Sequence, residues 1–253
     1  MPVFLEKSER TAWITLDRPP LNVLDLGLLR EMDQMLNSFP SESATDFLVI
    51  RGGGECAFSA GVDVRDHTLE KVPEMLRVVH GVVRKFLALP QITIALVRGA
   101  CLGGGLELAS SCDFILASEE SFFATPEINV GCYPPVALAR FPSLVGYHRA
   151  AELILTGQRI SAQQAAAMGL INRAVPAQEL NQAVEALLEE LRNKSGAVLR
   201  IALKGLREIR LGNFAAGLAR AEELYLTELL KTADVEEGVQ AFLSKRRPDW
   251  KHR

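Results

Sequence analysis

The sequence lacks the residue patterns that metal sites and disulfide frameworks require. It has only four cysteines and four histidines in 253 residues. The cysteines show no C-x-x-C spacing, and the histidines form no H-E-x-x-H motif. These absences argue against a bound metal. They predict reduced thiols buried in the core, at Cys56, Cys101, Cys112 and Cys132.

Signals for membrane insertion and export are also missing. The chain has no run of about 18 apolar residues. It reaches its first apolar segment at Val3 without a basic and then apolar leader. A soluble cytoplasmic protein is therefore expected, with no membrane partner. The net charge of −3 argues against a dedicated nucleic-acid binder, because such domains are usually strongly basic.

What is present is an ordinary globular composition. Hydrophobic residues make up 48% of the chain and charged residues 23%, which excludes disordered and collagen-like classes. A chain of 253 residues is long enough for one large domain with a sizeable core, with or without a small appendage.

The order of strand-like and helix-like segments predicts an α/β fold. Apolar runs predict strands at 3–6, 12–16, 47–50, 92–97 and 114–117. A helix at 105–111 would connect the last two strands, and such a β-α-β unit implies parallel pairing. The remaining helices are expected at 26–37, 68–89, 147–155, 161–168, 178–193, 197–210 and 214–232. Ser161 is the expected N-cap of its helix.

Three consecutive glycines, Gly103 to Gly105, stand between the strand at 92–97 and the helix that follows. Glycine is favoured where the chain turns tightly or brings its amides close to a ligand. The amides and dipole at a helix N-terminus suit negative charge, including the developing oxyanion of a carbonyl. A tight turn without function is the alternative interpretation.

Two glutamates near this turn, Glu107 and Glu127, lie in apolar segments where a solvated side chain is less expected. Apolar surroundings raise the pKa of a carboxyl group toward values useful in proton transfer. The two residues are too far apart to share one helix face, so they can meet only in the folded chain. His80, near the apolar stripe of the helix at 68–89, is expected to be a core or pocket-lining histidine, with a proton shuttle as the alternative.

Several segments together resemble the crotonase (enoyl-CoA hydratase/isomerase) superfamily. The resemblance is carried, in order, by AFSAGVD at 57–63, GGGLELA at 103–109, TPEINVG at 125–131, LTGQRISA at 155–162, AMGLIN at 167–172 and EGVQAFLSKR at 237–246. Each motif is weak alone, but their order along nearly the whole chain is specific. The resemblance implies a ββα spiral core at 1–195 that holds the CoA and acyl site. It also implies a C-terminal helical region at 196–253 for trimerisation and site closure.

The resemblance also implies a mechanism and its residues. The amides of Val62 and Gly104 would hold the thioester carbonyl, Glu107 would help deprotonate the attacking water, and Glu127 would deliver a proton to Cα. Arg65 stands where relatives often carry a lysine that faces the CoA phosphates. The remaining acyl-CoA contacts would come from Ala60, Gly103, Tyr133 and Pro134. No cofactor is expected, because the CoA belongs to the substrate.

The segment at 132–139 departs from the family pattern. Relatives usually continue with flexible glycines, whereas this chain has two prolines after Tyr133. Because this segment lines the acyl pocket in relatives, a plain straight-chain enoyl group is not the expected substrate. The chain looks most similar to cyclic dienoyl-CoA hydratases of aromatic degradation. A general short-chain enoyl-CoA hydratase and a Δ-isomerase stay open as alternatives.

Crotonases usually assemble as trimers or as dimers of trimers, so a homotrimer or homohexamer is expected, and internal packing alone is the other explanation of the helical part. A basic stripe at Arg200, Lys204, Arg207 and Arg210 resembles an RNA-binding face, and RNA-binding relatives exist. A solvated charged face is the more common explanation of such spacing.

Overall fold

A computed structural model describes residues 3–37 and 45–250. Within the second range, only the backbone of residues 209–213 is described. Its larger sheet has the strand order β1 (Val3–Ser8), β2 (Thr11–Leu16), β3 (Phe47–Gly52), β5 (Ile92–Val97), β7 (Phe114–Ser118) and β10 (Arg173–Val175). β1 and β2 form an antiparallel hairpin, and the other neighbours run parallel. The predicted α/β class and the parallel pairing of β5 with β7 are therefore confirmed.

A smaller sheet contains β4 (Ala57–Ser59), β6 (Ala100–Leu102), β8 (Phe122–Ala124) and β9 (Ile160–Ser161). The chain passes from β3 to β4, from β5 to β6 and from β7 to β8, so each of these three strands of the larger sheet is followed by a short strand of the smaller one. α2 (Val72–Ala88) and α3 (Gly104–Ser110) return the chain for the next turn. This strand-strand-helix repeat is the ββα spiral that the resemblance implied. The short strands β4, β6 and β8 were not predicted, because three residues are too few to show an alternating pattern in sequence.

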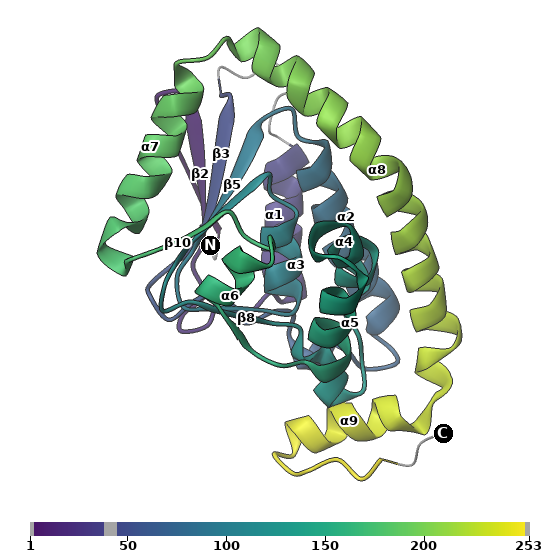
Figure 1. Cartoon of the computed structure of the whole chain (residues 1–253). Coiled ribbons are helices and arrows are strands. Elements are labelled where there is room, and N and C mark those ends of the chain that lie inside the picture. Colours follow the sequence, from purple (N-terminus) through teal and green to yellow (C-terminus); the bar gives the residue numbers. More distant parts are fainter. Residues whose placement is uncertain (1–2, 38–44, 251–253) are drawn as a thin grey trace.

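Helices cover both faces of the larger sheet, with α7 (Leu180–Arg192) on one side and α1 (Leu26–Asn37) and α2 on the other (Figure 1). Alternate residues of β3 point in opposite directions, as a strand requires. Phe47 packs in the cluster that includes Leu187 of α7, whereas Leu48 packs in the main core with α1 and α2. All six residues of β5 are buried for the same reason.

The expectation of two helices at 197–210 and 214–232 was wrong. One helix, α8, runs from Gly196 to Thr227 and lies along the outside of the molecule (Figure 1). Glycine and asparagine stand together at 212–213, and neither favours the interior of a helix. Packing of α8 against α4 (Pro135–Val145) outweighs that weak local preference. The predicted boundary after residue 195 coincides with the start of α8, and the division into two units stays a prediction.

The helices of the C-terminal half are α4, α5 (Tyr147–Thr156), α6 (Ala162–Ala167), α7, α8 and α9 (Ala233–Leu243). Ser161 caps α6 as predicted, and it forms a capping box with Gln164. α2 begins at Val72 and not at residue 68, with Pro73 in its first turn. In the described ranges, no helix has the length and apolar character needed to cross a membrane.

The four cysteines are free thiols, but the prediction that all are buried was wrong for Cys56. Cys56 is exposed because it belongs to the glycine-rich loop between β3 and β4. The other three thiols are buried, at Cys101, Cys112 and Cys132. Within residues 3–37 and 45–250, no cluster of three or more His, Cys, Asp or Glu side chains could hold a metal ion.

Candidate active site

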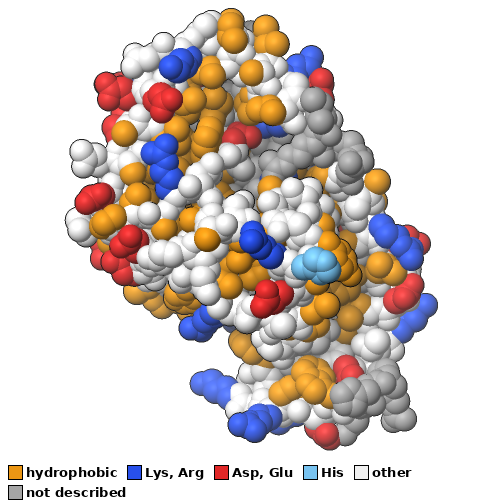
Figure 2. Space-filling model, in the orientation of Figure 1, with side chains coloured by type: hydrophobic (Ala, Val, Ile, Leu, Met, Phe, Trp, Pro, Cys, Tyr) orange, Lys and Arg blue, Asp and Glu red, His pale blue; other side chains and the backbone are white. Residues whose placement is uncertain are grey.

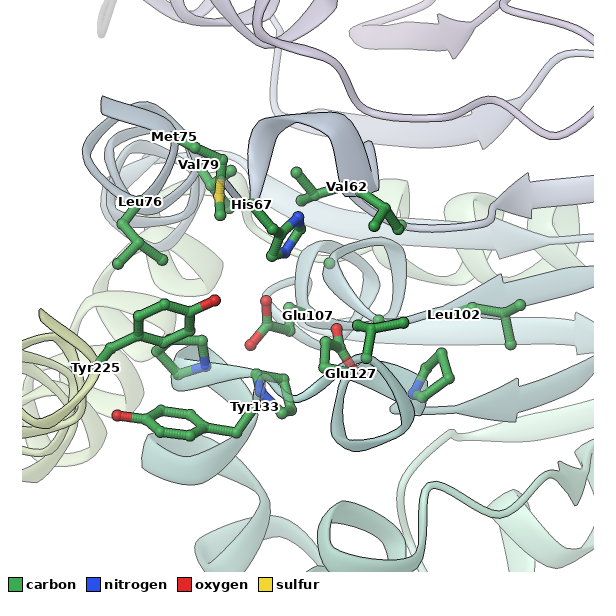
Figure 3. Close-up of a pocket in the computed structure, with 18 of the residues that line it drawn as sticks. Val62, His67, Met75, Leu76, Val79, Leu102, Glu107, Glu127, Tyr133 and Tyr225 are labelled. Atoms are coloured by element: carbon green, nitrogen blue, oxygen red, sulfur yellow. The ribbon is translucent and has the colours of Figure 1, made fainter. Parts of the chain in front are cut away.

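A cavity of about 340 Å³ lies where the glycine turn before α3, the short helix η2 (Pro126–Val130), α2 and α8 meet. Figure 3 shows the carboxyl groups of Glu107 and Glu127 near its centre, with His67 on one side and Tyr225 on another. All the predicted site residues except Arg65 line this cavity: Ala60, Val62, Gly103, Gly104, Glu107, Glu127, Tyr133 and Pro134. The fold thus brings together residues that are distant in sequence.

Glu107 lies in the first turn of α3 and is only 3% exposed. Its Oε1 accepts a hydrogen bond from the backbone N–H of Ala137, at 2.9 Å. Burial raises the pKa of Glu107, while the charge of His80 and the amides of Ala137 and Val136 oppose this shift. The opposing groups all favour the ionised carboxylate, so Glu107 is equipped to accept a proton.

Glu127 has the opposite environment. Its Oε2 is buried and has no hydrogen-bond partner among the described residues. Burial, and then the nearby Glu107 carboxyl, raise the pKa of Glu127 to about 8. A hydrogen bond from its own backbone N–H opposes this shift but is outweighed by burial and by the neighbouring carboxyl. Of the two glutamates, Glu127 is therefore the one equipped to donate a proton at neutral pH.

The backbone amides of Val62 and Gly104 lie beside each other at one end of the glutamate pair. A Cβ placed on Gly104 would be 3.4 Å from Val62 N, and a Cβ placed on Gly61 would be 3.3 Å from Gly104 N. Leu24 donates its N–H to the carbonyl oxygen of Gly61, and its own carbonyl oxygen accepts the N–H of Asp63. Among the described residues, the N–H of Val62 is therefore left without a partner. Gly104 begins α3, so its N–H has no partner in the helix. Two N–H donors are thus available to one oxygen atom.

Gly103 is required at its position for two reasons. Its φ of +50° lies in the left-handed region, where a residue with a Cβ is strained. A Cβ on Gly103 would also collide with Oε1 of the Glu127 carboxyl. The glycine turn therefore sets both the direction of the Gly104 amide and the space that Glu127 occupies.

His67 and Tyr225 are polar residues of the cavity that were not among the predicted site residues. His67 Nδ1 lies 3.1 Å from the carbonyl oxygen of Asp63. Since a carbonyl can only accept, Nδ1 carries the proton and Nε2 is an acceptor. Burial lowers the pKa of His67, so the ring is neutral. No motif marked either residue, because neither has a neighbour in sequence that suggests chemistry.

Comparisons with known proteins address the family of the chain. The model of the family described as enoyl-CoA hydratase/isomerase matches residues 6–253. The chain belongs to this family. It is 31% identical to a cyclohexa-1,5-dienecarbonyl-CoA hydratase of Thauera aromatica, over all of this chain and 97% of that one. It is 35% identical to a "Probable enoyl-CoA hydratase" of Rhizobium meliloti, over 99% of this chain and 98% of that one.

Among solved structures, an enoyl-CoA hydratase from Mycobacterium avium subsp. paratuberculosis superimposes with a TM-score of 0.89. The two are 26% identical, and the match covers 99% of each chain. The crotonase fold and an enzyme of the enoyl-CoA hydratase type, both implied by the resemblance, are thereby confirmed. Thioesters of CoA are the substrates that this family name denotes, which agrees with the predicted acyl-CoA substrate.

Arg65 is the predicted site residue that the structure places elsewhere. It lies on the surface, 67% exposed, with Nη2 2.5 Å from Oδ2 of Asp63. It borders a shallow hollow together with Asp25, Asp66 and Lys71. A CoA phosphate would compete with Asp63 for this guanidinium, because both are anions. The predicted contact between Arg65 and the CoA phosphates therefore stays a prediction.

The basic stripe on α8 is largely engaged within the protein. Arg200 pairs with Asp46 at 2.7 Å, and Lys204 lies 3.7 Å from Glu208. Arg207 is 11% exposed and pairs with Asp113 at 2.5 Å, so it fastens α8 to the larger sheet. The side chain of Arg210 lies outside the described residues. Figure 2 shows basic and acidic side chains interspersed on the visible face, which suits a solvated surface better than an RNA-binding one.

Proposed function

We propose that this enzyme adds water reversibly across a double bond of a cyclic dienoyl-CoA thioester formed in aromatic degradation. One observation carries the proposal: two carboxyl groups with different affinities for protons face the same cavity as two free backbone amides. Glu107 accepts an N–H at 2.9 Å, whereas Oε2 of Glu127 is without a partner in the described part of the chain. Hydration needs one group of each kind, a base for water and an acid for carbon.

The proposed reaction uses only these groups, water and the thioester. The amides of Val62 and Gly104 donate to the thioester oxygen and stabilise the negative charge of the enolate. Glu107 takes a proton from water while the water oxygen bonds to Cβ. The electron pair of the double bond moves toward the thioester. Glu127 then gives its proton to Cα. Because the carboxyl groups interact, their titration belongs to the pair. No cofactor beyond the CoA of the substrate is required.

A ring-shaped acyl group is supported by the wall of the cavity next to the glutamates. Pro134 and Pro135 line it where α4 begins, and proline restricts the backbone there. Tyr133 is fixed by a hydrogen bond of 2.7 Å to the carbonyl oxygen of Ala221. A rigid wall suits a compact ring better than a flexible chain. The Thauera aromatica relative, named for a cyclic dienoyl-CoA substrate, supports the same proposal.

A general short-chain enoyl-CoA hydratase is the second candidate. The Rhizobium meliloti relative favours it, because its higher identity of 35% comes with a name that specifies no ring. A Δ-isomerase would use the same enolate but return the proton to a different carbon. Retention of both Glu107 and Glu127 favours hydration over this alternative, since moving one proton needs only one carboxyl group.

Absorbance at the enoyl-thioester band tests the proposal. Crotonyl-CoA and cyclohexa-1,5-diene-1-carbonyl-CoA are supplied to the wild type and to the Glu107→Gln and Glu127→Gln variants. Turnover of the diene in preference to crotonyl-CoA, lost in both variants, is expected. Faster turnover of crotonyl-CoA would replace the ring-specific hydratase by the general one. A change in absorbance whose product has the same mass as the substrate, as measured by mass spectrometry, would establish the isomerase.

We also propose a trimer or a dimer of trimers, assembled through the helical region at 196–253. Large apolar side chains on α8 support it: Val198 is 64% exposed, Ile201 73% and Leu206 68%. Light scattering coupled to gel filtration is expected to give three or six times the chain mass of 27.7 kDa. A monomer at micromolar concentration would contradict assembly.

A further inference from the structure

The hydroxyl group of Tyr225 is a buried polar group that, among the described residues, interacts only weakly, with the thiol of Cys132. Tyr225 is 1% exposed and lines the cavity from α8. Its hydroxyl oxygen has no hydrogen-bond partner of good geometry among the described residues. The neighbouring polar group is the thiol of Cys132, which forms only weak hydrogen bonds. Buried hydroxyl groups normally have a partner, so this one suggests a ligand atom.

Tyr133 shows what a satisfied tyrosine looks like at the same place. The two rings meet edge to face, with centroids 5.1 Å apart. Tyr133 donates its hydroxyl to the carbonyl oxygen of Ala221, one turn of α8 before Tyr225. Figure 3 shows the Tyr133 hydroxyl turned away from the glutamates and the Tyr225 hydroxyl turned toward them. The first phenol therefore holds the wall of the cavity, and the second is free to meet a substrate.

The position of Tyr225 narrows the choice of ligand atom. In Figure 3, Tyr225 lies on one side of Glu107 and Glu127, and Val62 lies on the other. The thioester oxygen belongs at the amides of Val62 and Gly104, so it is not the partner of Tyr225. An enoyl group has no other oxygen. The atom left is the oxygen that hydration adds between the two glutamates.

We propose that Tyr225 is a substrate-binding residue whose hydroxyl donates a hydrogen bond to the oxygen added at Cβ, as water before the reaction and as the product hydroxyl after it. The inference rests on the proposed hydration. Tyr225 would thereby favour β-hydroxyacyl thioesters over acyl thioesters of the same shape that lack the hydroxyl. The thioester contact at Val62 and Gly104 would be the same for both.

Calorimetric binding of two saturated ring thioesters tests this proposal. The probes are 2-hydroxycyclohexane-1-carbonyl-CoA and cyclohexane-1-carbonyl-CoA, which differ only by the β-hydroxyl. Both are titrated into Glu127→Gln protein, so that dehydration does not consume the first probe. Tyr225→Phe is then added to this background, and Tyr133→Phe serves as the matched control in the same cavity. Thermal melts check that all proteins are folded.

Tyr225→Phe is expected to raise the Kd of the hydroxylated probe about five- to tenfold, the usual effect of one neutral hydrogen bond, and to leave the other Kd within about twofold. Tyr133→Phe is expected to change both Kd values alike. Equal effects of Tyr225→Phe on both probes, or no effect on either, would overturn the role of Tyr225 and leave the proposed hydration standing. Failure of both probes to bind the Glu127→Gln protein would overturn the acyl-CoA site itself.

Discussion

His80, which lines the cavity, and Glu222 join α2 to α8, with His80 Nδ1 2.6 Å from Oε1 of Glu222. The sequence offered no partner for His80, because Glu222 lies 142 positions later. Arg84 donates to the same carboxylate oxygen, also at 2.6 Å. His80 is 1% exposed and lines the cavity, which agrees with the prediction of a core or pocket-lining histidine. Its charge also favours the ionised form of Glu107.

Glu222→Gln is expected to destabilise the protein by about 2 kcal/mol, because it leaves the buried His80 without its carboxylate. His80 and Arg84 lower the pKa of Glu222, so its stabilising contribution is present above the unfolded-state pKa of about 4.3 and is lost as pH falls through the folded value. Urea unfolding at pH 7 and at pH 3.5 measures this. Arg84→Gln, at an exposed position, is the control and should cost less than about 1 kcal/mol. Equal stability of Glu222→Gln and wild type at pH 7 would contradict the argument.

The sequence was sufficient where a residue's role depends on its own backbone. The glycine turn, the buried strand at 92–97 and the N-cap at Ser161 follow from local rules, and the structure has them there. It was insufficient where a role depends on contacts between distant segments. Tyr225 shows no motif, Arg207 reads as one member of a basic stripe, and the continuity of α8 is decided by packing on α4. Short strands such as β6 also escaped, because three residues carry no period.

The rate of hydration is expected to fall above pH 8. Glu127 must carry a proton to act as the acid, and burial together with Glu107 raises its pKa to about 8. The turnover number should be level between about pH 6 and 7 and should drop toward tenfold per pH unit beyond the pKa. Initial rates from pH 6 to 9.5 on the better thioester measure this, with circular dichroism confirming the fold at each pH. A level rate up to pH 9.5 would show that Glu127 is not the proton donor.

Glu127→Gln is expected to make the protein more stable although it is inactive. Because the folded pKa of about 8 exceeds the unfolded value of about 4.3, the wild type loses stability as pH rises between these values, since the unfolded chain releases its proton first. An uncharged amide avoids this loss. The variant should gain on the order of 3–4 kcal/mol at pH 7 and only about 0.5 kcal/mol at pH 4.5. Denaturation curves at both pH values decide it, and a gain that is equal at both would point to packing and not to charge.

Gly103→Ala is expected to damage both stability and catalysis, whereas alanine at Gly205 should do neither. At Gly103 the backbone has φ of +50°, and the new Cβ would displace the Glu127 carboxyl. A cost of about 1–3 kcal/mol in unfolding free energy and a loss of roughly a hundredfold in the turnover number are expected. Gly205 lies in α8 with no atom within 4 Å of its Cβ position, so alanine there should stabilise the helix by about 0.5–1 kcal/mol. Urea unfolding and hydration rates of the two variants provide the comparison. Full activity in Gly103→Ala would mean that the glycine turn does not set the position of Glu127.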